Sequence, residues 1–127
     1  SSHSHGWGAS PTIFAGKYLL GVEPATPGFG SFTVLPSCGG LTRISGRVPT
    51  PHGTIEAGWE RSADGMTLRL TPPPGTRAKA GLPEEAGRRL FCDGRECERP
   101  EVLSLRRGRY IACDLGPGEH ELRLLPA

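Results

Sequence analysis

The stretch Thr54–Thr71, TIEAGWERSADGMTLRLT, carries the clearest secondary-structure pattern in this chain. Apolar residues alternate with other residues in both halves of it, and they are Ile55, Ala57 and Trp59 in the first half and Met66, Leu68 and Leu70 in the second. A period of two places such side chains on one face of a strand. The turn-forming run Ala63–Gly65 separates the halves. We therefore predict a β-hairpin with one buried face.

Shorter alternating segments flank this hairpin on both sides. Their apolar positions lie at 32–34 and 41–44 before it, and at 78–82, 90–92, 102–105, 111–115 and 122–124 after it. Turn residues separate the later segments, as at Asp93–Gly94, Arg107–Gly108 and Gly116–Gly118. Strands at intervals of about ten residues are typical of antiparallel sandwiches and barrels. We predict a mainly β fold, an antiparallel β-sandwich of jelly-roll type.

The amino-terminal region carries a different pattern. Ser10 suits a helix N-cap, Pro11 the first helical position and Gly21 the left-handed residue after a helix end. We predict one short α-helix over residues 11–20, with Ile13, Phe14 and Tyr18 on its buried side. A connector rich in proline and glycine follows it, and the period changes from helical to alternating near Pro27.

Length and charge restrict the class of protein. A chain of 127 residues with a net charge of +2 is the size of one domain. Its basic and acidic residues alternate, as in Arg95, Glu96, Glu98 and Arg99, so we expect no nucleic-acid partner. No apolar run is long enough to span a bilayer, so we expect a soluble chain with no membrane partner and leave the compartment open. Since the sequence does not start with methionine, we expect that it belongs to a longer product.

The four cysteines, Cys38, Cys92, Cys97 and Cys113, fit no common zinc-ligand spacing. We therefore predict no metal site. Reduced thiols that are mostly buried are the favoured state, and a disulfide stays open because Cys92 and Cys97 flank the Asp93–Gly94 turn. The sequence also lacks a phosphate-binding glycine loop and a nucleophile elbow, so no cofactor is expected.

Histidines and aromatic residues are the remaining candidates for a site. His3 is expected to be an ordinary polar residue near the terminus, and His52 is predicted in an exposed turn and His120 on the outer face of a strand. Trp59 shares a face with apolar residues and is predicted in the core. Tyr110 is the better candidate for an exposed aromatic. The acidic residues Glu56, Glu60, Glu119 and Glu121 are predicted to point outward, where solvent prevents the pKa tuning that a catalytic acid needs.

Three segments, in order, resemble the carboxyl-terminal portion of bacterial α-L-rhamnosidases, the inverting family with an (α/α)6 catalytic barrel. They are SHGWGASPTIFAGKYLLGVEPATPGF (4–29), VPTPHGTIEAGWER (48–61) and LTPPPGTRAKAGLP (70–83). The resemblance covers about residues 2–83. It implies that residues 1–30 are a remnant of the catalytic barrel, with an HGW loop, the helix and a linker, and that residues 31–127 form a carboxyl-terminal β-sandwich domain.

The same resemblance bears on the site. It implies that His5 and Trp7 bind substrate in the parent enzyme, His5 through a hydrogen bond to a sugar hydroxyl and Trp7 by stacking. Inverting hydrolysis needs two carboxyl groups about 6.5–9.5 Å apart, and the family's catalytic glutamates lie upstream of His5. We therefore expect no catalytic residue in this chain and an inert isolated fragment, although the parent is expected to be a glycoside hydrolase.

Two classes of function follow. In the first, the chain is an accessory or structural sandwich domain that packs on the catalytic barrel of its parent, with rhamnose-containing glycans as the associated ligands. In the second, it is a stand-alone carbohydrate-binding or protein-binding module. An uncovered apolar side of the helix at 11–20 would also favour self-association.

Overall fold

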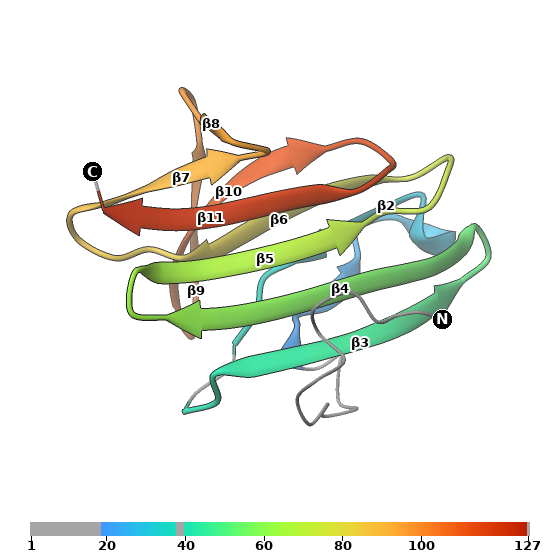
Figure 1. Ribbon diagram of the computed structural model, residues 1–127. Coiled ribbons are helices and arrows are strands. Elements are labelled where there is room, and N and C mark those ends of the chain that lie inside the picture. Colours follow the sequence, from blue (N-terminus) through green and yellow to red (C-terminus); the bar gives the residue numbers. More distant parts are fainter. Residues whose placement is uncertain (1–18, 38–39, 127) are drawn as a thin grey trace.

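The computed structural model describes residues 19–37 and 40–126, which fold into two packed β-sheets with one short 3-10 turn (Figure 1). The elements are β1 (Val22–Pro24), η1 (Pro27–Phe29), β2 (Ser31–Val34), β3 (Arg43–Thr50), β4 (Gly53–Ser62), β5 (Gly65–Thr71), β6 (Arg77–Pro83), β7 (Arg88–Cys92), β8 (Arg95–Glu96), β9 (Glu101–Leu105), β10 (Gly108–Leu115) and β11 (His120–Pro126). The predicted β-sandwich is thus confirmed. The helix predicted at 11–20 lies outside the described residues except for its last two positions.

The two sheets have different strand orders. Sheet A runs β1-β2-β6-β10-β9 and sheet B runs β3-β4-β5-β11-β7-β8. All pairs are antiparallel except β2 with β6, which run parallel. A parallel pair needs a crossover connection, and here the chain leaves sheet A after β2, builds β3, β4 and β5 in sheet B and returns at β6. Sequence alternation carries no information on this crossover.

The hairpin predicted from the opening stretch forms β4 and β5, which lie inside sheet B between β3 and β11. The register pairs Trp59 with Leu68 and Ala57 with Leu70, so the alternating apolar sets lie side by side on one face. The turn is shorter than predicted, because Ser62 pairs with Gly65 and only Ala63 and Asp64 lie between the strands.

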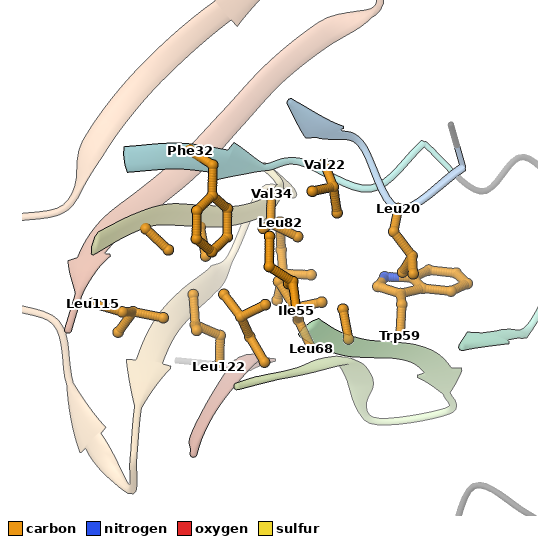
Figure 2. Close-up of a cluster of buried hydrophobic side chains, with 14 of the residues drawn as sticks. Leu20, Val22, Phe32, Val34, Ile55, Trp59, Leu68, Leu82, Leu115 and Leu122 are labelled. Carbon is orange, nitrogen blue, oxygen red and sulfur yellow. The ribbon is translucent and has the colours of Figure 1, made fainter. Parts of the chain in front are cut away.

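The core fills the space between the sheets. Figure 2 shows side chains from both sheets pointing toward one another, with Leu20, Val22 and Phe32 on one side and Trp59 and Leu68 on the other. Trp59 is 2% exposed, which confirms its prediction as a core residue. At about 25 cal/mol for each Å² of apolar surface, burial of these side chains supplies the main force that holds the sheets together.

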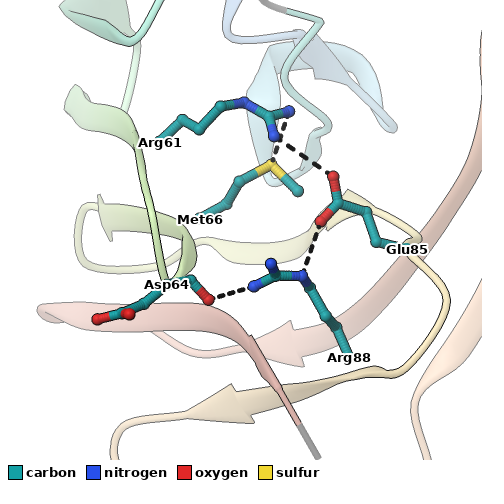
Figure 3. A network of polar contacts seen from close by, with 5 residues as sticks. All are labelled: Arg61, Asp64, Met66, Glu85 and Arg88. Carbon is teal, nitrogen blue, oxygen red and sulfur yellow. Dashed lines mark hydrogen bonds and ion pairs between the residues drawn. The ribbon is translucent and has the colours of Figure 1, made fainter.

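A polar network closes one rim of the sandwich, between the β4–β5 turn and the β6–β7 connection (Figure 3). Glu85 accepts from Arg61 at 3.4 Å and from Arg88 at 3.1 Å. Arg88 also donates to the backbone carbonyl of Asp64, and Arg61 donates to Met66 Sδ at 3.6 Å. Two connections far apart in the sequence are therefore fixed to each other at this rim.

The proline and glycine region before β2 also contributes to the sheet. Val22–Pro24, which sequence patterning places in a connector, pair with Phe32–Val34 as β1. Val22 is fully buried. The division of the chain at residues 30 and 31 stays a prediction.

Candidate functional site

Tyr110 and Arg107 hold the segment that leaves β2 against the outer face of sheet A. The Tyr110 hydroxyl donates to the Pro36 carbonyl at 2.7 Å. Arg107 Nε donates to the Tyr110 hydroxyl at 2.9 Å, and Arg107 Nη2 donates to the Leu35 carbonyl at 2.8 Å. The guanidinium carbon also lies 5.2 Å from the centre of the Tyr110 ring, within cation–π range. We call these four residues the Tyr110 clamp.

The clamp acts on the point where the chain enters the sandwich. The Leu35 amide donates to the Gly21 carbonyl at 3.2 Å, and the Ser37 amide donates to the Leu19 carbonyl at 2.8 Å. Gly21 has a φ of +67°, and a side chain there would overlap the Leu35 carbonyl, so only glycine fits. The prediction of a left-handed Gly21 is confirmed. The clamp therefore fixes the backbone of residues 19–21 relative to sheet A.

The prediction that Tyr110 is an exposed aromatic is wrong. It lies opposite Ile111 on the strand, as expected, but it is only 3% exposed. The prediction of exposure assumed that the outer face of the sheet is open to water. In the structure the Leu35–Pro36 segment covers that face at Tyr110. Arg107 was expected only as a turn residue, and no local signal marks its contact with Leu35, 72 residues away.

His120 is also placed differently from its prediction. It pairs in register with Leu70 at the end of β11, and its side chain is 19% exposed rather than pointing outward. Both ring nitrogens are engaged, Nδ1 with Asp93 Oδ2 at 2.7 Å and Nε2 with the Gly116 carbonyl at 2.9 Å. Side chains two residues apart lie on the same face of a strand. His120 is two residues before the buried Leu122, so it lies on the inner side, and the prediction of an outward position was wrong.

Asp93 organises the turn after β7. Its φ is +52°, and Gly94 follows at +87°, which is the tight-turn geometry that an Asp-Gly pair favours. Burial alone raises the pKa of Asp93, but the hydrogen bonds from His120 and from the Glu121 amide outweigh burial and hold that pKa below its ordinary value. This cluster fastens the β7–β8 turn to the start of β11.

The two residues that the resemblance assigns to substrate, His5 and Trp7, lie outside the described residues, as does His3. Their roles stay predictions. His52 lies in the exposed turn between β3 and β4, where its amide donates to Thr50 Oγ1 at 3.1 Å. The prediction of an exposed turn at His52 is confirmed.

The outward carboxylates take part in cross-strand ion pairs on sheet B. Glu60 pairs with Arg43 at 2.6 Å and Glu56 with Arg47 at 3.8 Å, while Glu121 pairs with Arg69 at 3.2 Å. Their side chains are 38–54% exposed. A carboxyl group that acts as a general acid is usually buried and kept away from such charged partners. None of these three is suited to act as a general acid.

Across residues 19–37 and 40–126, no group of three or more His, Cys, Asp or Glu side chains is arranged to hold a metal ion. In the same part of the chain, no helix has both the length and the apolar character needed to cross a membrane.

Solved structures share this fold. An α-L-rhamnosidase from Dictyoglumus thermophilum matches with a TM-score of 0.73 and 17% identity over 86% of this chain and 13% of that chain. An α-L-rhamnosidase from Streptomyces avermitilis, solved with L-rhamnose, matches with a TM-score of 0.66 and 19% identity over 85% of this chain and 10% of that chain. At such low sequence identity, these two matches show a similar fold and nothing further about this chain.

Sequence comparison is more specific. An α-L-rhamnosidase of Alteromonas sp. (strain LOR) is 36% identical over 56 residues, which are 43% of this chain and 6% of the relative. This chain thus corresponds to a small part of its relatives. The family model described as the bacterial α-L-rhamnosidase C-terminal domain matches residues 21–93. Since that match spans more than half of the 127 residues, the chain belongs to the bacterial α-L-rhamnosidase C-terminal domain family.

Proposed function

We propose that this chain is an accessory sandwich domain of a longer α-L-rhamnosidase and that it packs on the catalytic (α/α)6 barrel of that polypeptide. The observation that carries the proposal is the family match together with its coverage. The relatives are whole rhamnosidases, and the shared region is 6–13% of their length. In this proposal residues 1–30 belong to the end of the barrel and residues 31–127 to the sandwich.

The clamp geometry gives the proposed domain a mechanical role. The backbone of Leu19–Gly21 is tied to Leu35–Ser37 by two hydrogen bonds, and the Tyr110 clamp holds that segment on sheet A. A linker that is held where it leaves a domain fixes the orientation of the segments on its two sides, whereas a flexible linker does not. The sandwich would thus hold the HGW loop, with His5 and Trp7, in a fixed position at the sugar-binding end of the barrel.

The chain itself is proposed to be catalytically inert. Inverting hydrolysis needs one carboxyl group that is kept protonated and a second one across the sugar. The outward carboxylates Glu56, Glu60 and Glu121 pair with arginines on an exposed face. No pair of these groups meets the requirement.

The alternative of a stand-alone sugar-binding module has less support. Such modules bind sugars on exposed aromatic faces, and the described tryptophan and tyrosine, Trp59 and Tyr110, are both buried. Self-association through the helix at 11–20 rests on residues that the structure does not describe, and it stays a prediction.

Two measurements test the proposal. First, the purified chain is assayed on an aryl α-L-rhamnoside, and we expect no release of aglycone above buffer; activity that follows the chain through purification would show that it is not inert. Second, the chain is mixed with the separately expressed catalytic portion of the polypeptide that contains it, and we expect co-elution on size exclusion. An unrelated β-sandwich of similar mass is the control. Elution of both parts as separate monomers would contradict packing on the barrel.

A further inference from the structure

Three of the four cysteines converge at one edge of the sandwich. Cys92 ends β7 and Cys97 follows β8, and the hairpin register pairs Cys92 with Arg95 while the Cys97 amide donates to the Leu90 carbonyl at 2.8 Å. This register puts Cys97 opposite Leu90, so Leu90, Cys92 and Cys97 share a face of the hairpin. Leu90 is 1% exposed and Cys92 and Cys97 pack against the core, so the shared face points inward.

Cys113 meets these thiols from the other sheet. It pairs in register with the fully buried Ala80, which places it on the inner face of sheet A. Strands β7 and β10 belong to different sheets and lie close to each other at this edge (Figure 1). Cys92, Cys97 and Cys113 all pack against the same core cluster, and the Cys113 thiol lies near those of Cys92 and Cys97. All three thiols are free and partly buried.

Such a cluster can hold a soft metal ion or undergo oxidation. Among the described residues no such group is arranged to hold a metal ion, and neighbouring thiols can be joined by oxidation into a disulfide. A disulfide needs two Cα atoms about 4.4–6.8 Å apart with side chains directed at each other. Sandwich domains of the immunoglobulin type accommodate a disulfide of this kind between their sheets.

We propose that Cys92 and Cys113 form a reversible disulfide that links the two sheets, with a low-molecular-weight disulfide as the oxidant and Cys97 as a neighbouring third thiol. The Cys92 thiolate attacks one sulfur of the oxidant, which forms a mixed disulfide and releases one thiolate. Cys113 then loses its proton to water and attacks the Cys92 sulfur, which releases the second thiolate. Two protein thiols are oxidised while one small disulfide is reduced to two thiols.

The surroundings of the thiols set the expected rate. Burial raises the pKa of Cys113, and burial together with the charge of Asp93 raises the pKa of Cys92. A thiol with a raised pKa has little thiolate at neutral pH and reacts slowly. Formation of the disulfide should therefore be slow at pH 7 and accelerate as the pH rises toward 9.

The test uses the chain with Cys38→Ser, because Cys38 lies outside the described residues. The protein is equilibrated with oxidised and reduced glutathione at several ratios, quenched in acid, alkylated and mapped by peptide mass spectrometry. We expect two of the three remaining thiols to be lost, with a cross-link between Cys92 and Cys113. The midpoint of thermal unfolding should rise by roughly 5–10 °C in the oxidised form, because the link restricts the unfolded chain.

Two variants make the result specific. Cys97→Ser should keep the cross-link between Cys92 and Cys113 at an unchanged yield, whereas Cys113→Ala should lower the total intramolecular cross-link at least tenfold. Circular dichroism checks that each variant is folded, and if Cys113→Ala does not fold, the map of Cys97→Ser decides. The proposal is overturned if all three thiols stay free at the most oxidising ratio, or if the cross-link joins Cys92 to Cys97.

Discussion

Replacement of Tyr110 by phenylalanine tests the Tyr110 clamp most directly, because it removes one hydroxyl and keeps the ring. That hydroxyl makes two bonds, to the Pro36 carbonyl at 2.7 Å and from Arg107 Nε at 2.9 Å. The residue is 3% exposed, so water has little access to the carbonyl that loses its donor. The variant therefore isolates the polar part of the clamp.

The magnitude follows from the two bonds. A net hydrogen bond contributes about 1 kcal/mol, and a buried acceptor left without a donor costs about 1–3 kcal/mol. The bond from Arg107 counts for less because Arg107 is largely exposed. We expect Tyr110→Phe to lower the free energy of unfolding by about 1–2 kcal/mol, which is roughly 3–8 °C in the unfolding midpoint.

The assay is urea unfolding followed by tryptophan fluorescence, since Trp59 lies in the core. A double-mutant cycle with Arg107→Met, which keeps the apolar stem, should give a coupling of about 0.5–1 kcal/mol between the two positions. Arg106→Met is the matched control on the exposed neighbour, with an expected change of about 0.5 kcal/mol or less. A loss below about 0.5 kcal/mol for Tyr110→Phe, or additive effects of the two clamp variants, would show that the hydroxyl and Arg107 do not act together on Leu35 and Pro36.

Three further predictions concern packing and pH. Gly65→Ala should destabilise the chain by about 3 kcal/mol or more, because Gly65 has a φ of +152° and the added methyl group would overlap a carbonyl of β11. Thermal unfolding measures this loss, with Gly116→Ala as the control because open space surrounds Gly116. Equal unfolding midpoints for the two variants would contradict the prediction. Leu68→Ala, at a fully buried position, should cost about 3–5 kcal/mol by urea unfolding, and a loss under 1 kcal/mol would mean that the core collapses around the gap. Asp93→Asn should lower the free energy of unfolding by about 1 kcal/mol at neutral pH after solvent screening. Folding lowers the pKa of Asp93 from its ordinary 3.8. The stability that ionised Asp93 supplies is therefore complete above pH 3.8 and is lost as the pH falls through the lower folded pKa. Unfolding curves at pH 7 and at a series of lower pH values check this, and a difference between Asp93→Asn and the parent that does not shrink as the pH falls below 3.8 would contradict it.

Much of sheet B could be predicted from local patterning. Ile55 is buried between the exposed Thr54 and Glu56, and the Asp93–Gly94 pair has the backbone geometry that its sequence favours. These features depend on period and on turn chemistry, which neighbouring residues determine by themselves. The same holds for Gly21, whose left-handed backbone was expected from its position in the sequence.

The candidate site was predicted only in part. Tyr110 was placed on the correct face of β10, but its burial depends on Leu35 and Pro36, more than 70 residues away. His120 was placed on the wrong side of β11, and its partner Asp93 is 27 residues away. The alternation of apolar and polar residues along a strand does not indicate which distant segment of the chain covers a face of the sheet.

Alternation, turn residues and ordered motifs are local properties of the chain, and the fold class, the β4–β5 hairpin and the family could be predicted from them. Three features became visible only in the folded chain: the parallel pairing of β2 with β6, the Tyr110 clamp, and the meeting of Cys92, Cys97 and Cys113. Each of these depends on how two sheets with different strand orders pack face to face. Packing of that kind brings together residues far apart in the chain, and no local pattern encodes it.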